Sequence, residues 1–359
     1  MRREFVKGNV AIGKAAIAAG CRFYVGYPIT PQNDVPEFMS KALPEIGGTF
    51  LQGESEVASA NILMGASSTS VRAMTSTSGP GLSLMGEGIS FMTGGEVPAV
   101  LVDVARPGPG MGGIDAAQDD YFYVVKGPGN GGGRAFVMSP ESVQELVNQV
   151  YMAFDIADKY RNPVIILTDA VVGQSMEIVD IPEMCELSTL PDRSQWCLSS
   201  RNSQDASDRR MITSICQPNI KQKQLWEKLN DKFKAWDRDE VRYEEYLMDD
   251  AEVVIFAYGS VARVCKACAD QLREIGIKAG VFRPITLNPF PIQQIRNLDF
   301  LKIKKALCVE MTIQGKMLED VERAVAGKIQ VDFLGEYGGF LVKPTMVIDK
   351  VKELMKGDE

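Results

Sequence analysis

The sequence predicts an α/β protein with two domains, each built around a mainly parallel sheet. Short apolar runs alternate with stretches of helical spacing over residues 5–175, and the alternation starts again over residues 251–359. Strands separated by helices pair in parallel through right-handed crossovers. The first region is therefore expected to form a doubly wound domain, and the second a smaller α/β domain. A chain of 359 residues suits two or three domains.

Local signals place the elements of the first domain. A helix is expected over residues 7–20, because its apolar residues recur at helical spacing and Gly20 is a typical C-terminal cap. The apolar run 21–28 ends at Pro28 and indicates a buried strand and a turn. Thr30 or the pair Asn33–Asp34 can cap the next helix. Further strands are expected within residues 48–55, 71–81, 99–110 and 163–170, with helices between them.

Composition changes near residues 180 and 250. We expect a first domain over residues 1–180, a polar connector over 181–250 and a second domain over 251–359. The connector contains a charged stretch, residues 220–247, which is typical of a helix with a solvent-exposed face. The second domain opens with a strand, a glycine turn and a helix.

Charge and composition narrow the classes of function. A net charge of −8 argues against nucleic-acid binding, which needs a concentrated basic face. No apolar run reaches the roughly 18–20 residues that span a bilayer. The N-terminus lacks the pattern of a signal peptide. We therefore expect a cytoplasmic protein without membrane contact that acts on small molecules.

The cysteines and the absence of histidine constrain the chemistry. The seven cysteines are scattered and odd in number, which indicates reduced thiols, and Cys265 and Cys268 are expected on one helical turn rather than in a redox or iron–sulfur site. The chain contains no histidine, which excludes Ser-His-Asp catalysis and HExxH zinc chemistry. Carboxylates, lysine, arginine, hydroxyls or a bound cofactor must supply the chemistry. No metal site is expected on this chain.

Polar residues follow several predicted strands. The turn from Thr75 to Gly81 can bind an anion at a helix N-terminus, or can serve packing, but it does not match the P-loop pattern. Glu54 and Glu56 follow an apolar strand, where ligands bind in open α/β sheets, although either can simply be a favourable charge at a helix start. Arg106 can hold a substrate carboxylate.

Alternatives remain for the strand that ends at Arg106. The guanidinium can instead form an ion pair, with Asp103, Asp115 and Asp119 as the candidate partners. The glycine-rich segment that follows, residues 106–134, is too rich in glycine to pack on itself. Long loops of this kind are usually lids or interface segments.

Several motifs together resemble the alpha subunit of 2-oxoacid:ferredoxin oxidoreductases. They are GNVAIGKAAIAAGC, YPITP, QGESEVAS, TSTSGPG, EVPAVLVDVARPGPG and KYRNPVIILTDA, with FRPITLNPFP in the second domain. The resemblance implies a thiamine diphosphate pyrimidine-binding domain followed by a domain similar to the transketolase C-terminal domain. Among these enzymes the branched-chain (2-oxoisovalerate) class is favoured, and the 2-oxoglutarate class is the alternative.

The resemblance also assigns roles to residues. Glu56 would be the catalytic carboxylate that meets the aminopyrimidine ring and supplies, through the cofactor, a base without histidine. Thr30 and Arg106 would lie near the substrate carboxylate. The other cofactor-binding residues would be Tyr27, Pro28, Ser78 and Gly79.

Missing motifs point to partner subunits. The chain has no GDG segment for a metal–diphosphate site and no cysteine cluster for iron–sulfur centres. The resemblance therefore implies that Mg²⁺ and the 4Fe-4S clusters lie on partners: a beta (diphosphate-binding) subunit, a gamma subunit and a ferredoxin-like subunit. The complex would convert a 2-oxoacid and coenzyme A to acyl-CoA and CO2, with electrons passing to ferredoxin.

Two other classes of function remain open from the sequence. One is a self-contained nucleotide- or CoA-binding α/β protein that uses the TSTSGPG turn. The other is a non-catalytic assembly subunit in which Glu56 is structural.

Overall fold

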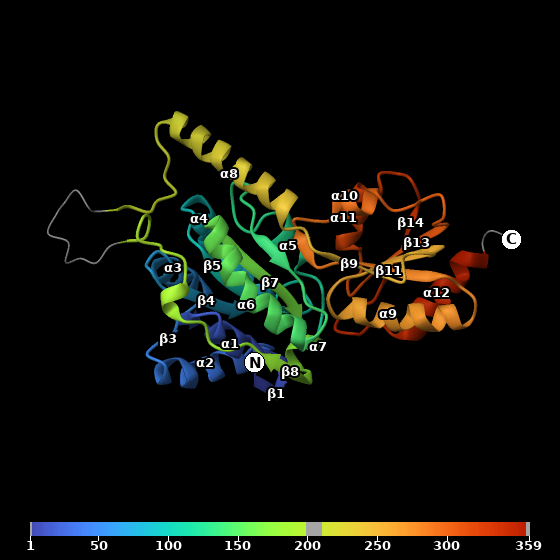
Figure 1. The fold of residues 1–359 in the computed structure, drawn as a ribbon, viewed down its shortest axis with the longest axis horizontal. Coiled ribbons are helices and arrows are strands. Elements are labelled where there is room, and N and C mark those ends of the chain that lie inside the picture. Colours follow the sequence, from blue (N-terminus) through green and yellow to red (C-terminus); the bar gives the residue numbers. More distant parts are fainter. Residues whose placement is uncertain (1, 199–209, 357–359) are drawn as a thin grey trace.

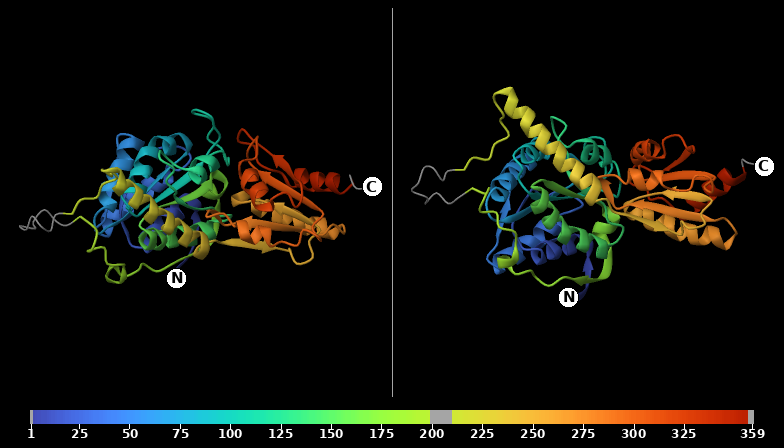
Figure 2. Two further views of the ribbon diagram at one scale, coloured as in Figure 1. Left: turned by 90° about the horizontal axis from the view of Figure 1, so that it is seen from above. Right: turned by 45° about the horizontal axis from the view of Figure 1, so that its top comes forward.

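The first domain is built on a seven-stranded sheet. The computed structural model describes residues 2–198 and 210–356, which form two α/β domains side by side (Figures 1 and 2). The strand order of the first sheet is β12-β6-β7-β5-β4-β2-β3, and every pairing is parallel except that of β12 with β6. These strands are β2 (Cys21–Gly26), β3 (Thr49–Gln52), β4 (Arg72–Thr77), β5 (Ala99–Ala105), β6 (Phe136–Met138), β7 (Pro163–Asp169) and β12 (Thr286–Asn288).

Helices cover both faces of this sheet. One apolar core joins the strands to α1 (Gly8–Ala18), α2 (Asp34–Glu45) and α6 (Val143–Tyr160). The opposite face packs against α3 (Glu56–Ser67), α4 (Gly79–Gly94) and α5 (Tyr121–Lys126). From β2 the chain runs to β3 on one side and then crosses back to β4 on the other. The carboxyl ends of β2 and β4 therefore flank the switch point at which ligands bind in such sheets.

The second domain has a smaller sheet of the same kind. Its order is β14-β13-β10-β11-β9, with β9 antiparallel. One face packs against α10 and α11, and the other against α9 and α12. The elements are β9 (Tyr243–Tyr246), β10 (Val253–Phe256), α9 (Gly259–Glu274), β11 (Ala279–Pro284), α10 (Ile292–Arg296), β13 (Lys305–Glu310), α11 (Lys316–Val325), β14 (Val331–Gly335) and α12 (Pro344–Lys356).

The fold class predicted from the sequence is confirmed, and the structure adds connections between its parts. β9, from the expected connector, joins the second sheet, whereas β12, from the second half of the chain, joins the edge of the first sheet. Helix α8 (Asn219–Asp239) exposes most of its charges, although Lys232 is largely buried against Glu96, and it buries Leu229, Phe233 and Trp236 in the core of the first domain. An antiparallel pair, β1 (Arg2–Lys7) with β8 (Met176–Ile181), was not predicted, nor was the short helix α7 (Ala170–Gln174) between β7 and β8.

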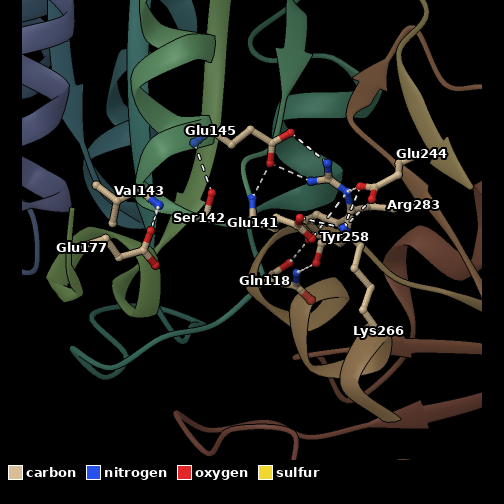
Figure 3. Close-up of polar contacts among 10 residues, drawn as sticks. All are labelled: Gln118, Glu141, Ser142, Val143, Glu145, Glu177, Glu244, Tyr258, Lys266 and Arg283. Carbon is tan, nitrogen blue, oxygen red and sulfur yellow. Dashed lines mark hydrogen bonds and ion pairs between the residues drawn. The ribbon is translucent and has the colours of Figure 1, made fainter. Parts of the chain in front are cut away.

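Ion pairs fix the junction between the domains (Figure 3). Arg283 on β11 is only 3% exposed and donates to both carboxylate oxygens of Glu145 on α6, at 2.7 and 2.9 Å. Lys266 on α9 bridges Glu141 and Glu244, with Nζ–oxygen distances of 2.7 Å to each. Gln118 donates from Nε2 to the carbonyl of Tyr258 at 3.0 Å. Because these contacts cross the junction, the second domain is held in a defined position against the first.

Within the described residues, no helix combines the length and the apolar character needed to cross a bilayer.

Candidate functional site

Glu56 presents a carboxylate without a polar partner at the carboxyl edge of the first sheet. It opens α3, whose N-cap Ser55 accepts a hydrogen bond from the backbone amide of Ala58 at 3.2 Å. The Glu56 side chain is only 6% exposed, yet within residues 2–198 and 210–356 it forms no hydrogen bond or ion pair. Glu54, two residues earlier, is exposed. The structure thus separates two carboxylates that their spacing after the strand left equivalent, and the buried one is Glu56, which the resemblance had selected.

A glycine allows Glu56 to lie against the start of α4. A Cβ atom added to Gly81 would lie 2.6 Å from Oε1 of Glu56 and 2.3 Å from Oγ1 of Thr77. Both distances are shorter than any ordinary contact, so only glycine fits beside this carboxylate. From the sequence, Gly81 was expected only in an anion-binding turn, and its contact with Glu56 was not predicted.

Buried hydroxyl groups without partners lie beside this glycine. Ser78 is the N-cap of α4 but makes no side-chain capping bond, and its Oγ is buried without a hydrogen-bond partner. Oγ1 of Thr75 and Oγ1 of Thr77 are likewise buried without a hydrogen-bond partner. Buried polar groups usually have a partner, and an exception needs an explanation such as a bound group or water. Together with the carboxylate of Glu56, this polar edge suits a ring that carries both donors and acceptors, as an aminopyrimidine does.

Two buried aspartates adjoin the same helix start. Asp103 lies in β5 in register with Thr77, and Asp120 directly precedes α5. Burial raises the pKa of Asp103 well above its usual range, and the neighbouring charge of Asp120 raises it further. Burial also raises the pKa of Asp120 to about 6, although a hydrogen bond with Asp103 opposes the shift. Near neutral pH the pair therefore shares one proton.

This pair of acids was missed from the sequence, where Asp103 was considered only as a partner for Arg106. A Cβ atom added to Gly79 would lie 3.3 Å from Oδ2 of Asp120, so the pair lies directly against the first turn of α4. The sequence signals this acid pair at one point only, where Asp103 interrupts the otherwise apolar strand β5.

Arg106 connects the loops after β2 and β5. Its Nη1 donates to the carbonyl of Thr30 at 2.8 Å, and its Nη2 donates to the carbonyl of Met111 at 3.0 Å. The side chain is 5% exposed, and its Nε is buried without a partner. Arg106 and Thr30, predicted to lie near each other, are therefore in direct contact.

Sequence reasoning also allowed an ion pair between Arg106 and an aspartate, and within the described residues this alternative is wrong. None of the three aspartates considered from the sequence forms a salt bridge with it, and Asp119 instead approaches Lys316 at 3.4 Å. Tyr27 and Pro28, at the end of β2, are exposed, Tyr27 to 39%. The carboxyl edge thus collects Tyr27 and Pro28 after β2, Glu56 after β3, Ser78 and Gly79 after β4, and Arg106 after β5.

The cysteine pair in α9 packs in the core. Cys265 and Cys268 are both buried with free thiols. Burial raises the pKa of the Cys265 thiol well above its usual range and that of Cys268 to about 11, so neither forms a thiolate readily. Across the part of the chain that the structure describes, no three cysteine, aspartate or glutamate side chains are grouped as metal ligands.

Comparison with known proteins defines the family. Residues 14–240 match the family described as pyruvate flavodoxin/ferredoxin oxidoreductase, thiamine diphosphate-binding, and residues 251–347 match pyruvate:ferredoxin oxidoreductase core domain II. The chain belongs to this family, as the motifs of the sequence predicted.

Its relatives include two kinds of enzyme subunit that it matches over nearly their whole length. The chain is 42% identical to ketoisovalerate oxidoreductase subunit VorB of Methanothermobacter marburgensis, over 99% of this chain and 98% of the relative. It is 34% identical to 2-oxoglutarate synthase subunit KorA of Methanocaldococcus jannaschii, over 96% of this chain and 98% of the relative.

A solved structure has the same fold. The 2-oxoglutarate:ferredoxin oxidoreductase of Magnetococcus marinus aligns with a TM-score of 0.84 at 24% identity, over 98% of this chain. This chain spans 65% of the length of that one.

Proposed function

We propose that this chain is the thiamine-pyrimidine-binding subunit of a 2-oxoacid:ferredoxin oxidoreductase and that Glu56 is its catalytic carboxylate. The observation that carries the proposal is the buried Glu56 side chain, which has no polar partner within the described residues and fits beside α4 only because residue 81 is glycine. Neither carboxylate oxygen of Glu56 is among the fully buried atoms without a partner, so the group is open to a ligand bound at this edge, which favours a role toward a bound group.

The cofactor and the chain divide the chemistry. When bound, thiamine diphosphate supplies the nucleophilic carbon and the electron sink for decarboxylation. Glu56 would hold the cofactor through a hydrogen bond to a ring nitrogen, which would set the protonation state of the ring. Ser78 and Gly79 offer a hydroxyl and a backbone amide at the N-terminus of α4. No histidine is needed for this arrangement, which agrees with the composition of the chain.

Arg106 and Thr30 are proposed to position the substrate carboxylate. The Arg106 guanidinium already joins the loops after β2 and β5, and its Nε has no partner. A carboxylate that approaches from the open edge would satisfy that donor through a charge-assisted hydrogen bond. Tyr27 and Pro28 are proposed to line the same edge, beside the cofactor.

The remaining parts of the reaction are assigned to other chains. We propose that a beta subunit holds the diphosphate and Mg²⁺, that 4Fe-4S clusters lie on partner subunits including a gamma and a ferredoxin-like subunit, and that ferredoxin accepts the electrons. Coenzyme A takes the acyl group, and the complex is cytoplasmic. The names of the relatives, each given as a subunit of an oxidoreductase, support an assembly of this kind.

The proposed substrate is a branched-chain 2-oxoacid such as 2-oxoisovalerate. Identity to the VorB relatives is 42%, against 30–34% to the KorA relatives. The second candidate is 2-oxoglutarate. The division into residues 1–180, 181–250 and 251–359 is kept as a proposal, with the two crossing strands as links between its parts.

A matched pair of substitutions tests the role of Glu56. In the complex reconstituted with its partner subunits, Glu56→Gln should lower viologen reduction that depends on 2-oxoacid and CoA by on the order of 10²-fold or more. Glu54→Gln makes the same chemical change two residues away on an exposed side chain and should leave turnover unchanged. Full turnover by the Glu56 variant would favour a purely structural role. Comparing kcat/KM for 2-oxoisovalerate and 2-oxoglutarate tests the substrate.

A further inference from the structure

A cleft with a cationic lining lies where the two domains meet. Its walls are α5, the C-terminal half of α8, the segment from β12 to α10, and α11, and its volume is about 840 Å³. The C-terminal end of α8 reaches this junction (Figures 1 and 2). From the sequence, the charges of α8 were expected only to face solvent.

The charge of this cleft is opposite to that of the chain. Although the chain carries a net charge of −8, the lining includes six cationic side chains and only two carboxylates. Asp237 pairs with Arg134, and Asp320 pairs with both Lys126 and Arg323, so cations of the lining already neutralise both acids. The cationic residues are Lys126, Arg134, Lys234, Arg238, Arg296 and Arg323.

Two of these cations have no carboxylate partner. Among the described residues, neither Lys234 on α8 nor Arg296 on α10 forms an ion pair. They come from different domains and face one cleft. Both side chains are exposed and neither charge is held by a carboxylate of the described residues, so both can contact a bound anion.

Contacts of Arg134 fix one wall of the cleft, and part of its lining is apolar. Arg134 is fixed by Asp237 and by Oδ1 of Asn288, and its guanidinium lies 5.3 Å from the ring centres of both Phe233 and Trp236. The apolar part of the lining consists of Val125, Val241, Leu287, Phe290 and Ile292. An inorganic anion alone would leave this wall without contacts.

We propose that this cleft binds a phosphorylated small molecule of the nucleotide class, with its phosphates on Lys234, Arg296 and their cationic neighbours and its base or other apolar part on the Phe290 wall. Guanidinium groups match phosphate oxygens in bidentate geometry. The volume lies in the range of pockets that enclose ligands of this size, about 300–1,000 Å³. Because both domains supply the walls, the ligand also bridges the junction.

Calorimetry on the assembled complex tests the proposal. ATP and inorganic pyrophosphate are titrated separately, which distinguishes a nucleotide from phosphate alone, and coenzyme A is not used because the proposed reaction already binds it as a substrate. The double substitution Lys234→Glu with Arg296→Glu should weaken binding of the nucleotide by on the order of tenfold or more. Lys221→Glu with Lys223→Glu changes charge equally on exposed positions of the same helix outside the cleft and should leave binding unchanged.

Several results would overturn the assignment. Absence of ATP binding would do so, as would an affinity that the Lys234 and Arg296 substitutions leave unchanged. Pyrophosphate that binds as tightly as ATP would exclude a role for the apolar wall. Binding to the lone chain that vanishes in the complex would mean that a subunit covers the cleft. Loss of binding in Ser78→Ala would move the site to the start of α4.

Discussion

Replacing Gly81 by alanine tests the contact between Glu56 and α4 with a single methyl group. The new Cβ would lie 2.6 Å from Oε1 of Glu56 and 2.3 Å from Oγ1 of Thr77. An ordinary carbon–oxygen contact is longer by roughly 1 Å, so one or both neighbours must move. Thr77 is a β-branched residue in a fully buried strand, whereas Oε1 is the far end of a flexible side chain. The carboxylate of Glu56 is therefore expected to be displaced.

The effects on stability and on activity should differ in size. Alanine inside a helix gains about 1 kcal/mol over glycine, while overpacking costs about 1–3 kcal/mol. The net change in unfolding free energy is thus expected to lie between about 0 and 2 kcal/mol of destabilisation, and the protein should fold. Displacement of a catalytic group by about 1 Å can cost on the order of 10²-fold in rate. Turnover should fall far more than stability.

The matched control is Gly65→Ala in α3. A Cβ atom at that position meets nothing within 4 Å, so this variant should gain stability by about 1 kcal/mol and keep full turnover. Urea unfolding gives the stabilities, and viologen reduction by the reconstituted complex gives the rates. If Gly81→Ala retained the turnover of the Gly65→Ala control, the position assigned to Glu56 would be refuted.

Two further predictions concern buried charges. Arg283→Met should destabilise the chain by about 3 kcal/mol in urea unfolding, because it leaves the carboxylate of Glu145 without its arginine partner. The control is Arg263→Met, which breaks an exposed pair with Glu177 and should cost less than about 1 kcal/mol. Equal losses in the two variants would contradict this reasoning. For Asp120, the folded pKa of about 6 exceeds its usual value, so the folded protein binds more protons than the unfolded chain and wild type loses stability as pH rises from about 4 to 6. Asp120→Asn lacks this loss, and its stability relative to wild type should therefore increase between pH 4 and pH 7; a constant difference would count against the raised pKa.

The position of the site could be predicted from sequence because it follows from strand ends. In a parallel sheet all carboxyl ends share one edge, so the turns after β2, β3, β4 and β5 necessarily converge. Thr30, Glu56, Ser78 and Arg106 lie in those turns or open the helices that follow. The choice between Glu54 and Glu56 could not be made in the same way, because it depends on which side chain turns toward α4 and on the space that Gly81 leaves there.

Contacts between segments far apart in the sequence could not be predicted from local sequence patterns. Asp103 and Asp120 meet only because the glycine-rich loop between them folds back, and no periodicity reports that path. The same holds for β12, which leaves the second half of the chain to pair with β6, and for Trp236, whose burial on the charged helix α8 depends on the surface it contacts. Each is a tertiary effect that overrides the local pattern.

The distribution of unpaired polar atoms separates structural from functional charge in this chain. At the domain junction the charges of Arg283, Lys266 and their glutamates pair with one another, although Oε2 of Glu141 lies 3.7 Å from Arg283 and makes no hydrogen bond. Of fifteen buried side-chain atoms without a hydrogen bond in the described residues, four lie on β4 and in the segments that follow β4 and β5, one each on Thr75, Thr77, Ser78 and Arg106. Each would cost about 1–3 kcal/mol if left unsatisfied. Glu56 lies at the same edge without a polar partner among the described residues, and a polar ligand bound there would satisfy these groups together, which is why Glu56 is assigned to the cofactor and not to the core.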